Sequence, residues 1–501
     1  MTDPASMRIA SFLRSFGAVS LGIVLSSCAA SPAPHPFASR MAHDAATASH
    51  SSPAERRSYD QAIRRLCQEL DRRGPDLAIQ QLRQSDVKVI LPKIPLPLQS
   101  IEIPKNSRPS SETIGIPIVL GYDTKNFPLY PPEGLFVDAS ALVRTIDGKT
   151  SLEFSTDRES IRIDGADYKL AIDPTGAGLH LERQARKLAK SGFISMLRPS
   201  SMERRPQIYL LDPYDPAKIP LLMVHGLQST PVAFASMVNA LRSDPDVRAK
   251  YQIWQFYYPS GSPVLANAAD LRDSLSKTLH TLDPKGEFPS NRRIVVIGHS
   301  MGGVISHSLV SSSDGALWAS IFRVPPAQLQ GDQEAIRRLT RILDFKRDPR
   351  VSRVIFMAAP HRGSPMADSF IGWFGNSLAR LSPMEESGFS ALARKNPEAM
   401  MPAAARFYDA GRFSAVRTLS PKSTALLALA DLPISIPYHS VIGQQRWEPT
   451  AQGSDGVVPY ASSHLDGADS ELIVRSGHGV IGNADAIREV IRILHEEGAK
   501  P

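Results

Sequence analysis

The chain has 501 residues, 42% of them hydrophobic, with 57 Lys and Arg against 50 Asp and Glu. This length predicts two or three domains, and the composition is that of a globular protein rather than a disordered one. The net charge of +7 is spread in ones and twos, without a basic block interleaved with aromatic residues, which argues against nucleic-acid binding. Two cysteines exclude a disulfide framework and a cysteine-based zinc site.

The N-terminus has the layout of a secretory signal. A short basic segment precedes an apolar stretch, residues 16–25, that is too short to span a bilayer. The following Leu25-Ser26-Ser27-Cys28 resembles the lipobox of bacterial lipoproteins, in which the cysteine becomes the lipidated first residue. The resemblance implies a signal peptide over 1–27, a lipid anchor on Cys28 and a place in the bacterial cell envelope. Ala29 stands where an Asp would resemble the inner-membrane retention signal, so the outer membrane is expected. The alternative is an ordinary signal peptide.

Three segments with different patterns follow the signal. Residues 28–57 are mostly Ala, Ser, Pro and His, which predicts a flexible tether with solvated histidines. Residues 58–110 predict a helix, with Cys67 as a packed thiol, and then a Pro-rich connector. Residues 111–204 contain short strand-like runs separated by Asp-Gly and Thr-Gly turn signals, which predicts a β-rich accessory domain.

Residues 205–501 alternate near-continuous apolar strands with helical stretches. This pattern predicts an α/β domain with a doubly wound, mostly parallel sheet. Residues 366–433 interrupt the pattern between two strands, and an insertion of this length predicts a helical cap over a pocket at the end of the sheet. A helical subdomain with its own packing is the alternative. The large apolar residues expected to line a pocket are Phe370, Trp373, Phe374, Met384, Phe389, Met400, Met401, Phe407 and Phe413.

The strongest motif is Gly298-His299-Ser300-Met301-Gly302. A buried strand over 293–297 runs into it and a helix follows, which is the context of a nucleophile elbow. The alternative is an ordinary Gly-rich turn between a strand and a helix. With this motif, residues 205–497 resemble the lipase and esterase branch of the α/β-hydrolase fold family. The resemblance implies that Ser300 is a catalytic nucleophile.

A serine nucleophile needs a base and an acid, and the family's chain order is Ser, acid, His. His478 follows the last predicted strand and is the expected base, with His464 as its rival. The sequence Asp-Gly-x-Val-Pro beginning at Asp455 resembles the acid loop of several lipases, so Asp455 is the expected acid. Asp466 and Asp469 are the alternatives if that loop is longer.

An oxyanion hole needs two donors already in place. The backbone N–H of Met301 would be one donor. The resemblance of His225-Gly226 to the family's oxyanion loop implies the N–H of Leu227 as the other, with His225 shaping the loop. His361, after the next strand, is expected to shape the pocket wall, and His307 to pack away from the site. No metal-ligand spacing, Walker loop or dinucleotide-binding glycine motif is present, so neither a metal nor a cofactor is expected.

The prediction for the whole chain is a membrane-anchored serine hydrolase that cleaves carboxylic esters with an apolar acyl chain. Its partners would be an ester or lipid substrate and, through the anchor, a membrane. Two alternatives remain open: an acyltransferase that uses the same residues with an alcohol acceptor, and a non-catalytic envelope lipoprotein. No residue pattern indicates an oligomeric state.

Overall fold

The computed structural model divides the chain into two compact units, residues 1–184 with 211–213, and residues 185–210 with 214–501. No helix in the described part of the chain is long and apolar enough to cross a bilayer. The residues that the structure describes are 36–46, 53–105, 113–146, 148–156, 160–163, 166–180, 182–183, 205–227, 229–366, 383–408, 415–446 and 449–498.

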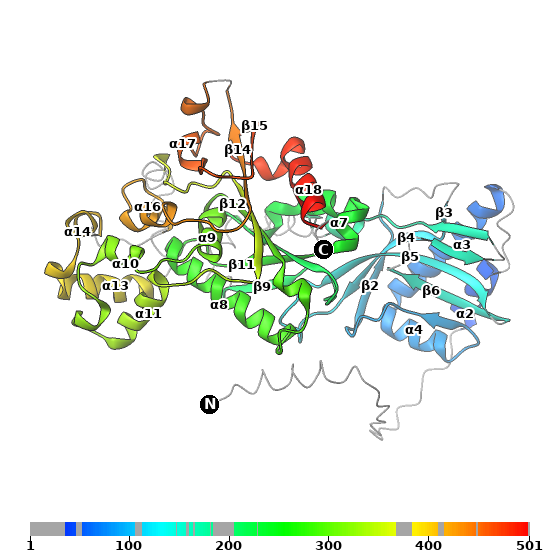
Figure 1. The fold of residues 1–501 in the computed structure, drawn as a ribbon. Coiled ribbons are helices and arrows are strands. Elements are labelled where there is room, and N and C mark those ends of the chain that lie inside the picture. Colours follow the sequence, from blue (N-terminus) through cyan, green and yellow to red (C-terminus); the bar gives the residue numbers. More distant parts are fainter. Residues whose placement is uncertain are drawn as a thin grey trace, which may run out of the picture. The chain divides into compact units, whose positions relative to one another are not determined.

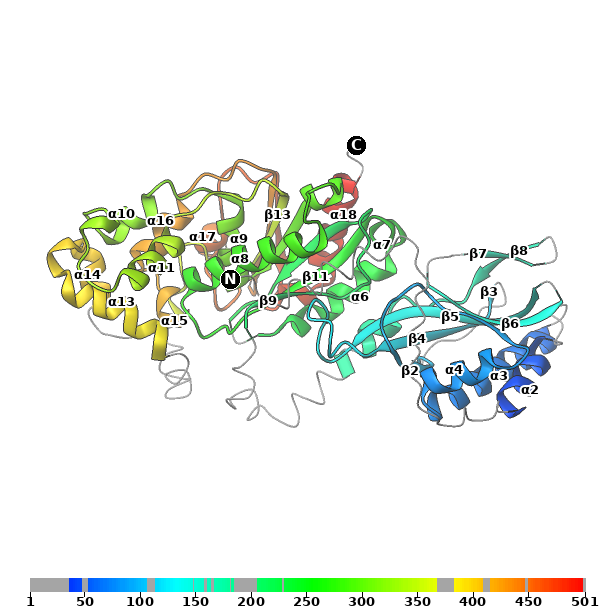
Figure 2. The same cartoon turned by 90° about the horizontal axis from the view of Figure 1, so that it is seen from below.

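The first unit is a five-stranded sheet with helices packed on it (Figures 1 and 2). The strand order is β1-β6-β5-β4-β2, with β1 parallel to β6 and the other neighbours antiparallel. Three further strands form a small sheet of order β3-β8-β7. The elements are α2 (Pro36–Ala46), α3 (Pro53–Arg72), α4 (Pro75–Arg83), β1 (Lys88–Ile90), β2 (Leu98–Glu102), β3 (Thr113–Ile114), β4 (Ile116–Tyr122), β5 (Leu135–Ile146), β6 (Lys149–Ser155), β7 (Ser160–Ile163) and β8 (Ala166–Leu170).

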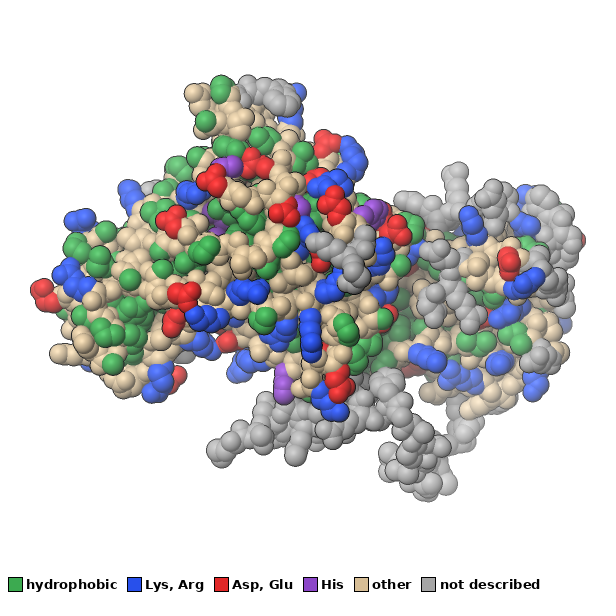
Figure 3. All heavy atoms as spheres, viewed as in Figure 1, with side chains coloured by type: hydrophobic (Ala, Val, Ile, Leu, Met, Phe, Trp, Pro, Cys, Tyr) green, Lys and Arg blue, Asp and Glu red, His purple; other side chains and the backbone are tan. Residues whose placement is uncertain are grey.

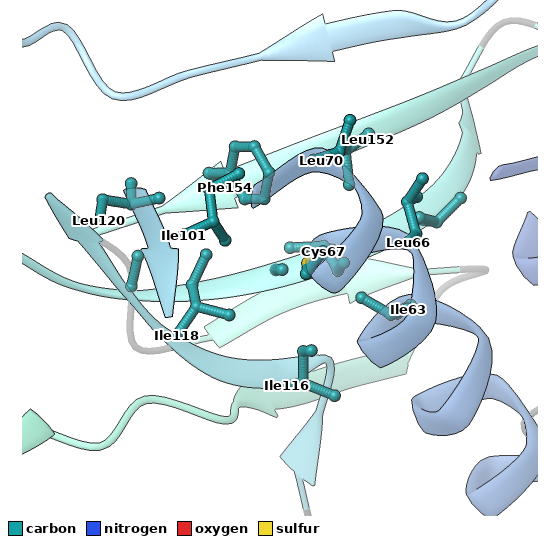
Figure 4. Close-up of a cluster of buried hydrophobic side chains, with 14 of the residues drawn as sticks. Ile63, Leu66, Cys67, Leu70, Ile101, Ile116, Ile118, Leu120, Leu152 and Phe154 are labelled. Atoms are coloured by element: carbon teal, nitrogen blue, oxygen red, sulfur yellow. The ribbon is translucent and has the colours of Figure 1, made fainter. Parts of the chain in front are cut away.

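The core of this unit lies between α3 and the five-stranded sheet. One face of α3 is buried at helical spacing, and Figure 4 shows it against side chains of β2, β4 and β6. Tyr59, at the start of this face, donates a hydrogen bond to the carbonyl of Val143 on β5 and accepts one from its N–H. The labelled members of the core are Ile63, Leu66, Cys67, Leu70, Ile101, Ile116, Ile118, Leu120, Leu152 and Phe154.

Two predictions for this part of the chain are wrong. The segment 28–57 is not a tether throughout, because helix α2 lies within it and Ala42 and Ala45 are fully buried in the core. Ala has the highest helix propensity, and its small side chain lets the helix pack closely. Nε2 of His43 in this helix lies 2.7 Å from Oδ2 of Asp86, so this histidine belongs to a packed helix and not to a linker. The Pro-rich segment is also not merely a connector, since it supplies β2 to the sheet, and β1 directly precedes it.

The second unit is built on a seven-stranded sheet of order β15-β14-β13-β12-β10-β11-β9. All neighbouring strands are parallel except β9, which is antiparallel to β11. Strands β10, β12 and β14 are buried along their whole length, as a sheet covered on both faces requires. The strands are β9 (Gln207–Leu210), β10 (Ile219–Val224), β11 (Tyr251–Tyr257), β12 (Ile294–His299), β13 (Val351–Met357), β14 (Tyr438–Gln444) and β15 (Ser470–Arg475).

The helices around this sheet fall into two sets, and the helices of each set contact one another. Helices α8 and α9 form one set, and α6, α7 and α18 form the other, as a doubly wound sheet requires (Figure 2). On the face drawn in Figure 3, Lys and Arg side chains are interspersed with Asp and Glu. The helices are α6 (Ala235–Ser243), α7 (Pro245–Lys250), α8 (Val264–Leu282), α9 (Met301–Val310), α17 (Tyr460–Ser463) and α18 (Ala484–Gly498).

A helical layer gathers at one end of the second unit, and two insertions build it rather than one (Figures 1 and 2). The predicted insertion supplies α13 (Pro383–Lys395), α14 (Pro402–Tyr408), α15 (Ala415–Thr418) and α16 (Thr424–Ala430). The segment between α9 and β13 supplies α10 (Ala316–Ile321) and α11 (Gln333–Leu343), which the sequence analysis did not assign to a cap. Contacts of α10 with α14 and α16, and of α11 with α13, join the two insertions.

Candidate active site

Ser300 stands on a sharp turn between β12 and α9. Its backbone has φ 56° and ψ −128°, an unfavourable conformation for a residue other than glycine. The Ser300 N–H donates to the carbonyl of Met357 on the adjacent strand at 2.9 Å. Residue 300 therefore sits at the carboxyl edge of the sheet, where functional groups of parallel α/β sheets gather.

The glycines of the motif are explained by the close approach of strand and helix at this turn. A Cβ on Gly298 would lie 2.6 Å from the Cα of Gly303, at the start of α9. A Cβ on Gly302 would collide with the backbone carbonyl of Val224 at the end of β10. The sequence thus folds here only with glycine at these positions, which fits the strand-turn-helix prediction.

A continuous chain of hydrogen bonds connects Ser300 with His478 and Asp455. The Ser300 Oγ lies 2.8 Å from Nε2 of His478, and Nδ1 of the same ring lies 2.7 Å from Oδ2 of Asp455. A carboxylate can only accept, so Nδ1 carries the proton and Nε2 is left to accept from the serine hydroxyl. The three residues come from loops after β12, β14 and β15, whose carboxyl ends meet at one edge of the sheet.

Backbone donors fix the carboxylate of Asp455. Its Oδ1 accepts from the N–H groups of Val457 and Val458 at 2.8 and 2.7 Å, which leaves Oδ2 for the imidazole. Asp455 is 1% exposed, whereas the side chain of His478 is 24% exposed. A buried carboxylate with three hydrogen bonds holds the imidazole of His478 in one orientation and one tautomer.

His299 is a further residue of the site that the sequence analysis missed. Its Nε2 lies 2.9 Å from the backbone carbonyl of His478, to which it donates. Burial lowers the pKa of His299 to about 4, so the ring is neutral at pH 7. This contact joins residues 179 positions apart, and no local sequence signal marks it.

The residues considered as alternatives to His478 and Asp455 have other interaction partners. His464 is within hydrogen-bond distance of Glu471 at 2.6 Å and of Asp466 at 3.0 Å, and the Glu471 carboxylate raises its pKa. Asp469 lies 3.8 Å from Arg353. His307 is fully buried on α9 and its Nε2 lies 3.4 Å from the carbonyl of Leu432, consistent with packing.

The loop after β10 lies directly against the nucleophile. A Cβ on Gly226 would lie 2.9 Å from the Cβ of Ser300, so the loop backbone borders the serine. His225 is buried and stacked on Tyr258, whose hydroxyl donates to the His225 carbonyl at 2.5 Å. Burial lowers the pKa of His225 to about 4, which suits a neutral ring that shapes the loop. Leu227 is half-buried in this loop, and Met301 opens α9.

The cap residues named from the sequence have different positions. Phe389 borders a cavity in the helical layer, Met400 is buried, Phe407 is half-buried and Met401 is exposed. The predictions for Phe370, Trp373, Phe374, Phe413, the side chain of Met384 and Cys28 lie outside the described residues. Within the described ranges, no cluster of three or more His, Cys, Asp or Glu side chains could hold a metal ion.

Comparisons with known proteins give only distant similarity. No protein-family model and no curated protein sequence matches the chain. Among solved structures, the chain is similar to the lipase BlEst2 of Bacillus licheniformis in its mature form, at 17% identity and a TM-score of 0.34, over 57% of this chain and 97% of that one. It is also similar to lipase 1 of Pelosinus fermentans, at 13% identity and a TM-score of 0.35, over 57% of this chain and 100% of that one. A third similar structure is the metagenomic carboxyl esterase MGS0156, at 19% identity and a TM-score of 0.32, over 56% of this chain and 76% of that one. Similarity at this level does not establish a common family.

Proposed function

We propose that this chain is a serine hydrolase of the α/β-hydrolase type that cleaves carboxylic esters. The observation that carries the proposal is the hydrogen-bonded series Ser300, His478 and Asp455, with the serine held at positive φ between a strand and a helix. A buried carboxylate, an imidazole and a serine hydroxyl in this order are the groups required for nucleophilic attack on an acyl carbon. The substrate would be an ester of an acid with an apolar chain.

In the first half of the reaction, the Oγ of Ser300 attacks the ester carbonyl while Nε2 of His478 takes its proton. The carbonyl oxygen becomes an oxyanion, which the N–H groups of Met301 and Leu227 would stabilise. Asp455 stabilises the imidazolium that forms and remains ionised. When the tetrahedral intermediate collapses, the bond to the leaving oxygen breaks, and His478 gives that oxygen its proton. An alcohol leaves and the acyl group stays on Ser300.

In the second half, water takes the place of the alcohol. Nε2 of His478 removes a proton from water, and the resulting hydroxide attacks the acyl carbon. A second oxyanion forms, which the same N–H groups of Met301 and Leu227 would stabilise. Its collapse breaks the bond to Ser300, whose oxygen recovers the proton from His478. The products are a carboxylic acid and the free enzyme, so the balance requires only ester and water.

Mutation of the nucleophile and the base tests this proposal. In hydrolysis of p-nitrophenyl butyrate, Ser300→Ala and His478→Ala should each lower kcat at least about a thousandfold, because the two groups act as a unit. The matched control is His464→Ala, which removes the other histidine of the same region and should leave the rate near that of the parent. Parental hydrolysis by purified Ser300→Ala would contradict the proposal.

We also propose that Cys28 carries a lipid anchor that holds the enzyme at the bacterial outer membrane. Leu25-Ser26-Ser27-Cys28 after an apolar stretch supports this, and several acyl chains would bind a bilayer firmly. Cys28→Ser should leave the protein with its signal uncleaved or release it into the soluble fraction. A mature, membrane-bound Cys28→Ser protein would exclude the anchor without affecting the catalytic proposal.

A further inference from the structure

Helix α3 of the first unit carries arginines on the side that faces away from the sheet. Figure 2 shows α2, α3 and α4 on one side of the five-stranded sheet, and α3 buries Ile63, Leu66 and Leu70 against it. At 3.6 residues per turn, positions 57, 61, 65, 68 and 72 fall on the opposite side of this helix. All five are exposed, and we call them the basic face of α3: Arg57, Gln61, Arg65, Gln68 and Arg72.

The acidic side chains of the same helices are directed elsewhere. Asp71 and Asp76 accept from backbone N–H groups of β2 at 2.8 and 3.2 Å, so both carboxylates are turned towards the sheet. Glu69 is buried and pairs with Arg72 and Arg73. The other acidic residues of the three helices lie off the basic face and are Asp44, Glu55 and Asp60. The outward side of α3 is therefore positive, although the sequence has no basic block.

Helix α4 adds an exposed apolar side chain to this side of the unit. Leu77 is 49% exposed and lies on the side of α4 opposite the buried Ile79 and Leu82. Helices α3 and α4 contact each other and both pack on β2. Arginines together with an outward apolar residue are typical of surfaces that lie on anionic membranes, since such binding combines electrostatic attraction with buried apolar area.

The proposed lipid anchor would bring these helices to a bilayer. Cys28 precedes Pro36, the first residue of α2, by eight positions, and a chain of this length spans at most about 28 Å. Helix α2 in turn packs against α3. An acylated Cys28 would therefore keep the three helices close to lipid headgroups.

We propose that the basic face of α3, together with Leu77, binds the headgroups of anionic phospholipids and forms a second membrane contact besides the anchor. The proposal rests on the proposed anchor for its place in the cell, but the surface itself needs no acyl chain. The guanidinium groups donate to phosphate oxygens, and Leu77 enters the boundary between headgroups and acyl chains. Within the first unit, α3 then lies along the bilayer and the five-stranded sheet is directed away from it.

Sedimentation with vesicles tests this surface in the absence of the anchor. The mature chain, beginning at residue 28, is produced with Cys28→Ser and without the signal peptide, so that it carries no acyl chain. It is mixed with vesicles of phosphatidylcholine, alone or with an equal part of phosphatidylglycerol. At about 20 mM salt it should bind the phosphatidylglycerol vesicles at least about tenfold more tightly than phosphatidylcholine alone, and about 500 mM salt should release it.

Substitutions on the proposed surface should weaken this binding. Arg57→Gln, Arg65→Gln and Arg72→Gln together should lower the partition coefficient for phosphatidylglycerol vesicles about a hundredfold at low salt, at about fivefold per arginine. Leu77→Ser should lower it about fivefold, because less apolar surface leaves water. Glutamine is a good helix former, so α3 should remain folded in the triple variant.

The matched control combines Arg292→Gln, Arg323→Gln and Arg347→Gln, which removes the same charge from exposed positions of the second unit. It should bind the phosphatidylglycerol vesicles like the parent. Equal losses in the two triple variants would mean that binding follows net charge alone and would overturn the proposal. Equal binding of the parent to both kinds of vesicle, or binding to neither, would also overturn it.

Failure of the anchor or of the catalytic proposal would be seen separately. In washed cell membranes, high salt should release the mature Cys28→Ser protein and leave the acylated parent bound. A mature Cys28→Ser protein that resists the salt wash would exclude the anchor as the reason for membrane attachment. Both triple variants should hydrolyse p-nitrophenyl butyrate at the parental rate, whereas retained activity in Ser300→Ala would overturn the catalytic proposal alone.

Discussion

The imidazole of His299 donates a hydrogen bond of 2.9 Å to the backbone carbonyl of His478. The residue directly before the nucleophile thus holds the loop that carries the base. The two rings lie 5.2 Å apart between their centroids. A change at position 299 should therefore affect the Ser300–His478 geometry without removing any group that reacts.

This contact makes His299 a positioning residue. His299→Phe removes the donor and should lower kcat about tenfold with little change in KM, since a neutral hydrogen bond contributes about 1 kcal/mol. His299→Gln can present an amide donor near the position of Nε2 and should restore most of the rate. Steady-state kinetics on p-nitrophenyl butyrate measures both. Equal losses in the two variants would show that packing of the ring, and not its hydrogen bond, matters.

The acid at position 455 can be distinguished from its two rivals by amide substitution. Asp455→Asn should lower kcat about 10³- to 10⁴-fold, because the amide favours the wrong tautomer of His478. Asp466→Asn and Asp469→Asn should remain near the parental rate, since their carboxylates contact His464 and Arg353 instead. A severe loss in either of these controls, with Asp455→Asn active, would reassign the acid.

The three proposed catalytic residues could be predicted because their signals are local. A buried strand entering Gly298-His299-Ser300 and a histidine just after the last strand can both be read within about ten residues. The contact of His299 with His478 could not be predicted, because it exists only when β12 and β15 lie in one sheet. Helix α2 was missed for another reason: its burial depends on Ala42 and Ala45, whose small side chains give little periodic signal.

The helical layer of the second unit shows the same limit. Two of its helices, α10 and α11, lie in a stretch between a helix and a strand that has no distinctive composition. The sequence analysis therefore did not assign α11 to an insertion, although this helix packs against α13 of the other insertion. Pairing of two insertions is a property of the folded chain, and the sequence indicates only that each is amphipathic.

The turn glycines predict a strong effect on stability. Gly302→Ala places a methyl group into the Val224 carbonyl and should destabilise the second unit by several kcal/mol. Gly482→Ala is the control, because nothing lies within 4 Å of the added Cβ. Urea unfolding followed by tryptophan fluorescence reports this unit, since Trp254 and Trp318 lie in it and the residues of the first unit include no tryptophan. Equal midpoints for the two variants would contradict the tight approach of strand and helix.

A buried histidine predicts how stability depends on pH. His361 is 1% exposed, and neither ring nitrogen has a hydrogen-bond partner among the described residues. Burial places its pKa well below the ordinary value of about 6.5. Below pH 6.5 the unfolded chain binds a proton at this ring that the folded chain does not, so stability falls as pH falls.

The substitution His361→Phe replaces the titrating imidazole with a ring that binds no proton in either the folded or the unfolded chain. Relative to the parent, the variant should gain about 1.4 kcal/mol per pH unit below pH 6.5, with no pH-dependent difference above pH 7.5. The measurement is urea unfolding at pH 5, 5.5, 6 and 8. A difference that stays constant across this range would mean that His361 is not held neutral in the folded chain.

The most direct test of the central claim is covalent labelling by a fluorophosphonate, followed by mass spectrometry of the labelled peptide. A serine activated by His478 and Asp455 reacts with this probe, whereas an ordinary buried serine does not. The parent should carry one label, on Ser300, and Ser300→Ala should carry none, with His464→Ala labelled like the parent. An unlabelled parent that is folded, or a label retained in Ser300→Ala, would contradict the assignment of Ser300 as the nucleophile.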